Sequence, residues 1–380
     1  MQSKLPKVGT NIFTVMSQLA VEHKAVNLGQ GFPDFPPPAR LIDALERAMR
    51  AGDNQYAMMT GTPRLRRAIA DKTERMYGVC PDADGEITVT SGGSEAIFDA
   101  VQAVVSAGDE VIVLDPCYDI YEPAIELAGG RAVHVALDAE TFAPDWRKVR
   151  EAVTARTRLI IVNSPHNPSG AMLGEADMRE LADIVVGHGL WLISDEVYEH
   201  IVFDGARHES ALRHPALRER AFVISSFGKT YHCTGWKVGY VVAPPPLTAE
   251  LRKVHQYNTF CTFHPAQTAF AEMIEAEPGH YETLGAFYQE KRDRFRRQLE
   301  GTRFRPLSVP GGYFQLVDYS GLSDMSDLEF SRWLTIEHGV TGVPLSPFYA
   351  EPPAGQRLLR LCFAKSDDTL DAAIERLARL

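Results

Sequence analysis

Short apolar segments alternate with longer amphipathic segments through the middle of this 380-residue chain, and this alternation constrains its fold more than any other feature. Because most of the short segments are apolar throughout, the strands that they predict should be covered on both faces. Such strands, alternating with helices, indicate a mostly parallel, doubly wound α/β sheet. We predict strands over residues 86–90, 110–115, 158–163, 190–195, 221–226 and 238–243.

The segments around these strands predict helices and a second, smaller domain. Residues 94–108 and 175–189 are amphipathic and end at glycine, as helix C-termini often do. The proline-rich residues 31–40 predict an extended segment that enters the main domain. The C-terminal part predicts a smaller α+β domain. We expect an N-terminal arm with part of the small domain at 1–41, a large domain at 42–280 and a small C-terminal domain at 281–380.

The formal net charge of -11 excludes some classes of partner. A general affinity for nucleic acid or for anionic lipid would need a clustered basic face, so we expect neither partner. The N-terminal residues lack the layout of a signal peptide, and no apolar run approaches the roughly 20 residues that span a bilayer. A cytoplasmic location is the default expectation.

Cysteine and histidine usage predicts no metal site. The five cysteines are scattered singly, and the chain contains no CxxC pair and no HExxH motif. His208 and His214 stand in a polar, arginine-rich stretch, which predicts a solvated loop.

Unusual residues collect where the predicted strands end. Because the ligands of doubly wound sheets bind beyond the carboxyl ends of the strands, residues at these positions should share one site. The residues concerned are Gly92, Gly93, Ser94, Tyr118, Asn167, Asp195 and Lys229.

Lys229 admits three interpretations besides a solvated surface charge. A P-loop would need glycine where this chain has Val223, which excludes that motif. Ser226 and Lys229 match the SxxK of serine acyl-transferring enzymes, but the SDN and KTG elements are absent. The third interpretation is a Schiff-base lysine that holds pyridoxal phosphate. Desolvation or a neighbouring cation can supply the neutral amine that this role needs, and this interpretation also explains the other strand-end residues.

Six segments carry a more specific resemblance: SSFGKTYHCTGWKVGY, NSPHNPSG, SDEVY, TSGGSEAI, VNLGQGFPDFPPP and LLRLCFAK. In the order in which they occur along the chain, they resemble the class I aminotransferases, which are pyridoxal-phosphate enzymes of fold type I. The resemblance covers nearly the whole chain. Within the class, the N-terminal segment at residues 9–35 and the segment GKTYHCTGWKVGY look most like those of bacterial methionine aminotransferases and their kynurenine aminotransferase relatives.

The resemblance implies roles for residues around the cofactor. Lys229 would hold the aldehyde, and Asp195 would keep the ring nitrogen protonated so that the ring acts as an electron sink. Tyr198 and Asn167 would bond the ring oxygen, and Tyr118 would stack on the ring. The phosphate would be bound by Gly93 and Ser94, at a strand-to-helix junction that favours anions, together with Ser226 and Lys237.

The resemblance also implies how substrate is bound. Arg360 would bind the substrate carboxylate, with Gly31 nearby, and Phe13 would line the side-chain pocket or anchor the N-terminal arm. Tyr56 would reach the phosphate of a neighbouring subunit, which implies a homodimer. Structural alternatives remain for several residues: a cap at Asp195 or Ser94, a turn at Asn167, packing at Tyr118 and an ion pair at Arg360.

These roles predict an aminotransferase that moves the amino group of methionine, or of aromatic or similarly large uncharged amino acids, to a 2-oxo acid by ping-pong kinetics. Lys229 would carry the proton between the substrate α-carbon and the imine carbon of the cofactor. A cysteine-conjugate β-lyase, or another eliminase on the same scaffold, is the nearest alternative. A pyridoxal-phosphate-binding regulatory domain is the alternative without catalysis. It is disfavoured by the acidic charge and by a chain that begins almost at the family's N-terminal arm.

Overall fold

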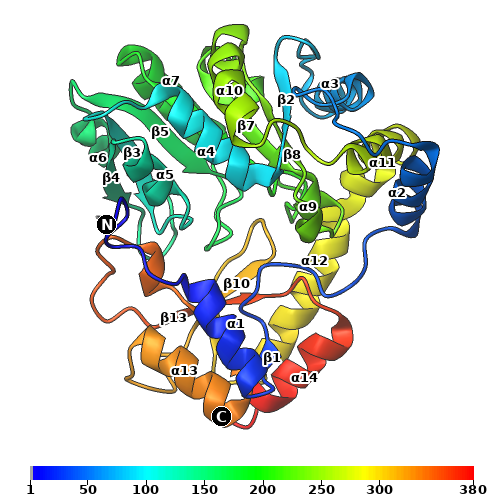
Figure 1. Ribbon diagram of the computed structural model, residues 1–380. Coiled ribbons are helices and arrows are strands. Elements are labelled where there is room, and N and C mark those ends of the chain that lie inside the picture. Colours follow the sequence, from blue (N-terminus) through cyan, green and yellow to red (C-terminus); the bar gives the residue numbers. More distant parts are fainter. Residues whose placement is uncertain (1–2) are drawn as a thin grey trace.

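A seven-stranded sheet forms the centre of the computed structural model, which describes residues 3–380 (Figure 1). The strand order is β2-β8-β7-β6-β5-β3-β4. β8 runs antiparallel to both of its neighbours, whereas the other adjacent pairs are parallel, so the predicted α/β class is confirmed. The strands are β2 (Ile87–Thr90), β3 (Glu110–Asp115), β4 (Arg131–Ala136), β5 (Thr157–Asn163), β6 (Trp191–Asp195), β7 (Ala221–Ser226) and β8 (Gly239–Val242).

Each of the six predicted strands is present, with ends that differ by at most one residue. The prediction missed β4, which pairs with β3 alone at one edge of the sheet. An edge strand has no second neighbour, and β4 leaves Arg131 and Ala136 exposed. Its sequence therefore lacks the continuous apolar run by which the buried strands were recognised.

Two helical layers cover the two faces of this sheet, as Figure 1 shows. Ile112 and Leu114 of β3 point into one layer, and Val111 and Val113 point into the other. This alternation along one strand produces the doubly wound arrangement. The first layer contains α2 (Ala39–Ala51), α3 (Pro63–Tyr77), α6 (Trp146–Ala152), α7 (Glu175–Gly187), α8 (Pro215–Arg218) and α11 (His264–Ala276). The second contains α4 (Gly92–Val104), α5 (Tyr121–Leu127) and α10 (Pro245–Asn258).

The predicted helix at 94–108 requires a correction. α4 begins two residues earlier and ends at Val104, and its C-cap Val105 is already extended, with φ -99° and ψ 130°. Gly108, with φ +87°, belongs to the turn before β3 and does not end the helix. α7 ends at Gly187, two residues before the expected Gly189.

A second group of elements joins the two ends of the chain. Val26 and Asn27 of β1 (Val26–Asn27) pair in parallel with β11 (Val340–Thr341). A four-stranded antiparallel sheet has the order β12-β13-β10-β9. Its strands are β9 (Arg305–Pro306), β10 (Phe314–Asp318), β12 (Val343–Pro344) and β13 (Leu358–Cys362). The helices here are α1 (Ile12–Glu22), α12 (Gly279–Leu299), α13 (Asp327–His338) and α14 (Asp367–Leu377).

The proposed domain limits can be compared with these elements. Residues 28–38, which include most of the proline-rich segment, form no helix or strand and lead into α2. The expected limit at residue 281 lies inside α12, which begins at Gly279. A division of the chain at 41 and 281 therefore remains a proposal.

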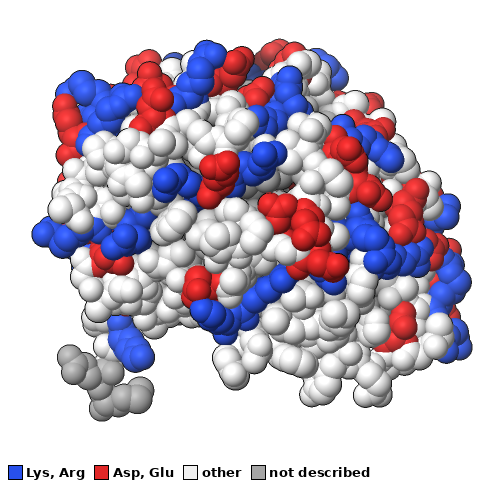
Figure 2. Space-filling model, turned by 90° about the horizontal axis from the view of Figure 1, so that it is seen from above, with Lys and Arg blue, Asp and Glu red and all other residues white. Residues whose placement is uncertain are grey.

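The surface carries both signs of charge. On the face in Figure 2, basic and acidic side chains are interspersed over the described residues, without one broad basic area. Among residues 3–380, no helix is both long and apolar enough to cross a membrane. The expected solvation of His208 is wrong, because His208 is buried and its Nε2 lies 2.9 Å from Glu196 Oε2, although residues 204–207 of the same loop are exposed.

Candidate active site

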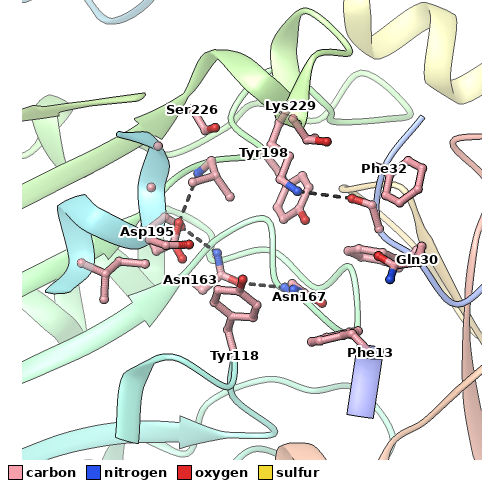
Figure 3. A pocket seen from close by; sticks show the side chains of 18 of the residues that line it. Phe13, Gln30, Phe32, Tyr118, Asn163, Asn167, Asp195, Tyr198, Ser226 and Lys229 are labelled. Carbon is pink, nitrogen blue, oxygen red and sulfur yellow. Dashed lines mark hydrogen bonds between the residues drawn. The ribbon is translucent and has the colours of Figure 1, made fainter. Parts of the chain in front are cut away.

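A cavity of about 280 Å³ lies at the carboxyl edge of the central sheet, against β10 and β13 of the smaller sheet. It brings together residues that are far apart in the sequence, as Figure 3 shows. The predicted site residues that line it are Phe13, Gly31, Gly93, Ser94, Tyr118, Asn167, Asp195, Tyr198, Ser226, Lys229, Lys237 and Arg360.

Tyr56 is the predicted site residue that does not line this cavity. Its side chain is 84% exposed, and its ring contacts Phe260 with ring centroids 5.5 Å apart. Tyr56 therefore lies at the surface of the chain, outside the cavity.

Lys229 stands on the short helix α9 (Phe227–Thr230), directly after β7. Its Nζ donates to the carbonyl oxygen of Gly31 at 3.3 Å (Figure 3) and lies 5.6 Å from the centre of the Tyr198 ring. Desolvation lowers the pKa of Lys229 to about 8, and repulsion from Arg360 acts in the same direction. At pH 7 about a tenth of this amine is therefore neutral, and hence nucleophilic, whereas almost none would be at the usual pKa of 10.5.

Asp195 is a buried carboxylate at the end of β6. Its Oδ2 accepts a hydrogen bond from Tyr121 Oη at 2.7 Å, and its backbone carbonyl accepts one from Asn163 Nδ2 at 2.8 Å. Burial raises the pKa of Asp195 to about 6, and the bond from Tyr121 opposes that rise. A cation next to this carboxylate would stabilise its charged form.

The start of α4 and the side chain of Lys237 form a part of the cavity that favours an anion. Gly92 and Gly93 begin α4, and no side chain caps this helix at Ser91. The free N–H groups of a first helical turn favour an anion. Gly92 has φ +78°, and a Cβ placed on it would lie 3.4 Å from Lys237 Nζ. The ammonium group is thus next to the start of the helix.

Arg360 is a buried cation that also lines the cavity. Its side chain is 1% exposed, and no carboxylate of the described residues forms an ion pair with it. Nη1 donates to Asn167 Oδ1 at 2.7 Å, Nη2 donates to Gly29 O at 2.9 Å, and Nε has no partner. The guanidinium lies 4.0 Å from the centre of the Phe314 ring. A buried charge without a counter-ion is costly, so this group fits an anionic ligand.

Several residues of the site were missed by the sequence analysis. Tyr121 follows Tyr118 by three positions, and Asn163 ends the predicted strand before Asn167, so both had a local signal. Gln30 stands in the GQGF segment that supplied Gly31. Phe314 belongs to a strand of the smaller sheet, and no local pattern connects it with the cavity. Other lining residues that were missed are Phe32, Ile97, Val197 and Thr234.

The arrangement fits pyridoxal phosphate in three independent places. The start of α4 with Lys237 suits a phosphate, and the buried carboxylate of Asp195 suits a protonated ring nitrogen. The amine of Lys229 suits the aldehyde. All three lie on one cavity, which also contains the unpaired Arg360.

Comparisons with known proteins agree with this geometry. Residues 23–377 match the family model described as aminotransferase class I and II. The methionine aminotransferase of Escherichia coli (strain K12) is 54% identical over 379 residues, which cover 100% of this chain and 98% of that protein.

Solved structures of aminotransferases also match this chain. An Escherichia coli structure described as having a methionine aminotransferase function superposes with a TM-score of 0.98 at 54% identity, covering 100% of this chain and 99% of the other. An N-succinyldiaminopimelate aminotransferase from Mycobacterium tuberculosis has a TM-score of 0.96 at 40% identity, with coverage of 100% and 99%. Human kynurenine–oxoglutarate transaminase 1 is 33% identical in sequence, with 99% of this chain and 97% of that protein covered.

These relatives are enzymes, so the alternative of a regulatory domain without catalysis is not supported. Together with the family match over residues 23–377, they show that the chain belongs to the class I and II aminotransferases and is a pyridoxal-phosphate-dependent aminotransferase.

Proposed function

We propose that this enzyme transfers the amino group of methionine, and of other large uncharged or aromatic L-amino acids, to a 2-oxo acid. The observation that carries the proposal is the pairing, in one cavity, of a desolvated Lys229 with a buried and unpaired Arg360. The first residue suits chemistry at an α-carbon, and the second suits an α-carboxylate.

Arg360 binds and orients the substrate. Two of its five N–H groups hold Asn167 and Gly29, so the others remain for a carboxylate. A guanidinium held between the rings of Phe13 and Phe314 keeps its position before substrate arrives. Gly31, whose carbonyl accepts from Lys229, packs closely against Phe314, the ring that the guanidinium of Arg360 contacts.

Cofactor binding is assigned to the remaining residues. Gly93, Ser94, Ser226 and Lys237 would hold the phosphate, and Tyr118 would pack against the ring. Asp195 would hold the proton of the ring nitrogen, and Asn167 and Tyr198 would donate hydrogen bonds to the ring oxygen. When bound, pyridoxal phosphate supplies an electron sink for the bonds at the substrate α-carbon. Lys229 would hold the cofactor aldehyde at rest, and its Nζ would move the proton of the substrate α-carbon.

The walls of the cavity support the choice of amino donor. Phe13, Phe32, Phe314 and Tyr118 surround the site, and aromatic rings form favourable contacts with a thioether as well as with other rings. Among the described residues that line the cavity, Arg360 is the single arginine, so no second guanidinium is available for a dicarboxylate side chain. The 54% identity with the Escherichia coli methionine aminotransferase also supports methionine as donor.

A homodimer with shared sites is also proposed. The residues at 55–58 lie beside those at 257–264, because His264 Nδ1 is 3.2 Å from the carbonyl oxygen of Gln55. Both segments expose apolar side chains, and a surface of this kind marks a protein interface. The exposed residues are Tyr56, Met58, Tyr257, Phe260 and Phe263. Tyr56 would then contribute to the phosphate site of the partner.

A matrix of amino donors and 2-oxo acids tests the proposed function. With purified enzyme, methionine and aromatic donors should give the highest kcat/KM, and aspartate should give a value at least about 100-fold lower because a charged side chain finds no partner. A clear preference for aspartate, or release of ammonia from a cysteine conjugate without any acceptor, would contradict the proposal.

A further inference from the structure

A buried group of three ionisable side chains lies outside the cavity, between α4 and α10. His255 of α10 is 0% exposed, and its Nδ1 lies 2.7 Å from Glu95 Oε1 and 3.5 Å from Asp99 Oδ2. Its Nε2 lies 2.9 Å from the carbonyl oxygen of Met59. A carbonyl oxygen only accepts, so Nε2 carries a proton and donates to Met59.

Glu95 connects this group to the start of α4. The backbone N–H of Ser91 donates to Glu95 Oε2, which closes the first turn of the helix. Gly92, Gly93 and Ser94, which this turn contains, line the cavity. The Glu95 carboxylate therefore shapes the anion-binding turn, but its negative charge is unfavourable next to a bound phosphate.

His255 balances that charge. Burial lowers the pKa of His255, but the interactions with Asp99 and Glu95 raise it by more than burial lowers it. The resulting pKa is about 9. The ring is therefore an imidazolium at neutral pH. Asn258, on the last turn of α10, donates to Asp99 Oδ1 at 2.8 Å and completes the contacts between the two helices.

The bond to Met59 extends the network to another segment. Residues 58–61 run beside β2, where Val89 N donates to Thr60 O at 3.1 Å. Tyr56, which we assign to the partner's phosphate site, lies three residues before Met59. One imidazolium thus contacts Glu95, which bonds the turn at 91–94, and the segment that carries Tyr56.

We propose that His255, acting through Glu95, is a positioning residue for the cofactor phosphate and couples the turn at 91–94 to the segment at 56–61. This inference rests on the proposed function, because it requires the phosphate to bind at that turn. The positive charge of His255 permits a carboxylate to brace the turn without repelling the phosphate.

A double-mutant cycle on cofactor affinity tests the proposal. His255→Gln should raise the dissociation constant of pyridoxal phosphate about tenfold, because Glu95 is left uncompensated. The affinity for pyridoxal, which lacks the phosphate, should change less than about twofold. Glu95→Gln added to His255→Gln should restore the affinity for pyridoxal phosphate, because the amide oxygen still accepts from Ser91 without a charge.

In this cycle, two outcomes would overturn the proposal: unchanged affinity in His255→Gln, or no recovery in the double variant. Lys237→Ala separates this failure from failure of the proposed function. If Lys237→Ala weakens pyridoxal phosphate and His255→Gln does not, the inference about His255 alone is wrong. If neither variant weakens it, the phosphate does not bind at this turn.

Further measurements do not depend on activity. If His255→Gln does not fold, two variants of Glu95 replace it. Glu95→Gln should keep the affinity for pyridoxal phosphate, and Glu95→Ala should lower it. Equal affinities in these two variants would contradict the role of Glu95. In folded apoprotein, His255→Gln should accelerate amide exchange in peptides covering both 56–61 and 91–94, and unchanged exchange would contradict the coupling. Dialysis against a chelator should leave the affinity unchanged, whereas a loss would show that a metal ion, and not a proton, balances the carboxylates.

Discussion

Arg360 and Asn167 are joined by a hydrogen bond of 2.7 Å between Nη1 and Oδ1, although 193 residues separate them in the sequence. Arg360 belongs to β13 of the smaller sheet, and Asn167 follows β5 of the central sheet. Because the bond uses the amide oxygen of Asn167, the amide nitrogen is left as the donor. The residue assigned to the substrate carboxylate thus orients a residue assigned to the cofactor ring.

Replacing Arg360 with lysine tests this relationship. Arg360→Lys should lower kcat/KM for methionine about 100-fold, because an ammonium cannot hold Asn167, Gly29 and a carboxylate in one planar arrangement. Stopped-flow measurement of the half-reaction with methionine would show the change. Arg357→Lys is the matched control, since Arg357 forms a surface ion pair with Asp324 at 2.9 Å. Equal losses in the two variants would contradict the assignment.

The pKa of Lys229 predicts how the apoprotein captures its cofactor. A protonated amine does not attack an aldehyde, so capture of pyridoxal phosphate should accelerate about tenfold per pH unit below the pKa of Lys229 and level off above it. Because desolvation lowers this pKa from 10.5 to about 8, the plateau should begin near pH 8. Absorbance of the bound cofactor reports the rate. A rate that continues to rise toward pH 10.5 would show an ordinary, solvated lysine.

Tyr121→Phe tests the hydrogen bond to Asp195. The phenol donates to the carboxylate and stabilises its charged form, so its loss should raise the pKa of Asp195 above about 6. Asp195 acts as an anion, and the acid limb of the kcat/KM profile should therefore move to higher pH. Tyr319→Phe, which removes a 3.0 Å bond to Met325 O in the smaller domain, is the control. An unshifted acid limb in Tyr121→Phe would contradict the coupling.

Complementation between inactive variants tests the shared site. A Lys229→Ala chain and a Tyr56→Ala chain should form a hybrid dimer with one site that contains both native residues. Random reassociation of equal amounts should then place native sites at about a quarter of all sites. Transaminase activity and single-site cofactor absorbance would measure them. No gain over the separate variants, in samples shown to contain hybrid dimers, would contradict the contribution of Tyr56.

Much of the central sheet was predictable, because strands covered on both faces must be apolar along their length. Residues 110–115 and 221–226 were predicted with their observed limits. β4 was missed because an edge strand does not need such a run. The antiparallel direction of β8 depends on pairing with β2 and β7, which no local pattern records.

The site was predictable where residues follow strands or belong to a known motif. Asp195 and Lys229 were found by their position after buried strands, and Arg360 was found by resemblance. Phe314 could not be found, because its place at the cavity depends on how the smaller sheet packs. The burial of His208 was missed for a similar reason: its partner Glu196 belongs to another segment, and local composition alone suggested exposure.

The most direct test of the account is to identify the lysine that holds the cofactor. The purified enzyme should be reduced with borohydride in the presence of pyridoxal phosphate, digested, and mapped by mass spectrometry. The account predicts a single cofactor-modified peptide, with the modification on Lys229, and no modified peptide in Lys229→Ala. Modification of a different lysine in the parent enzyme would contradict it.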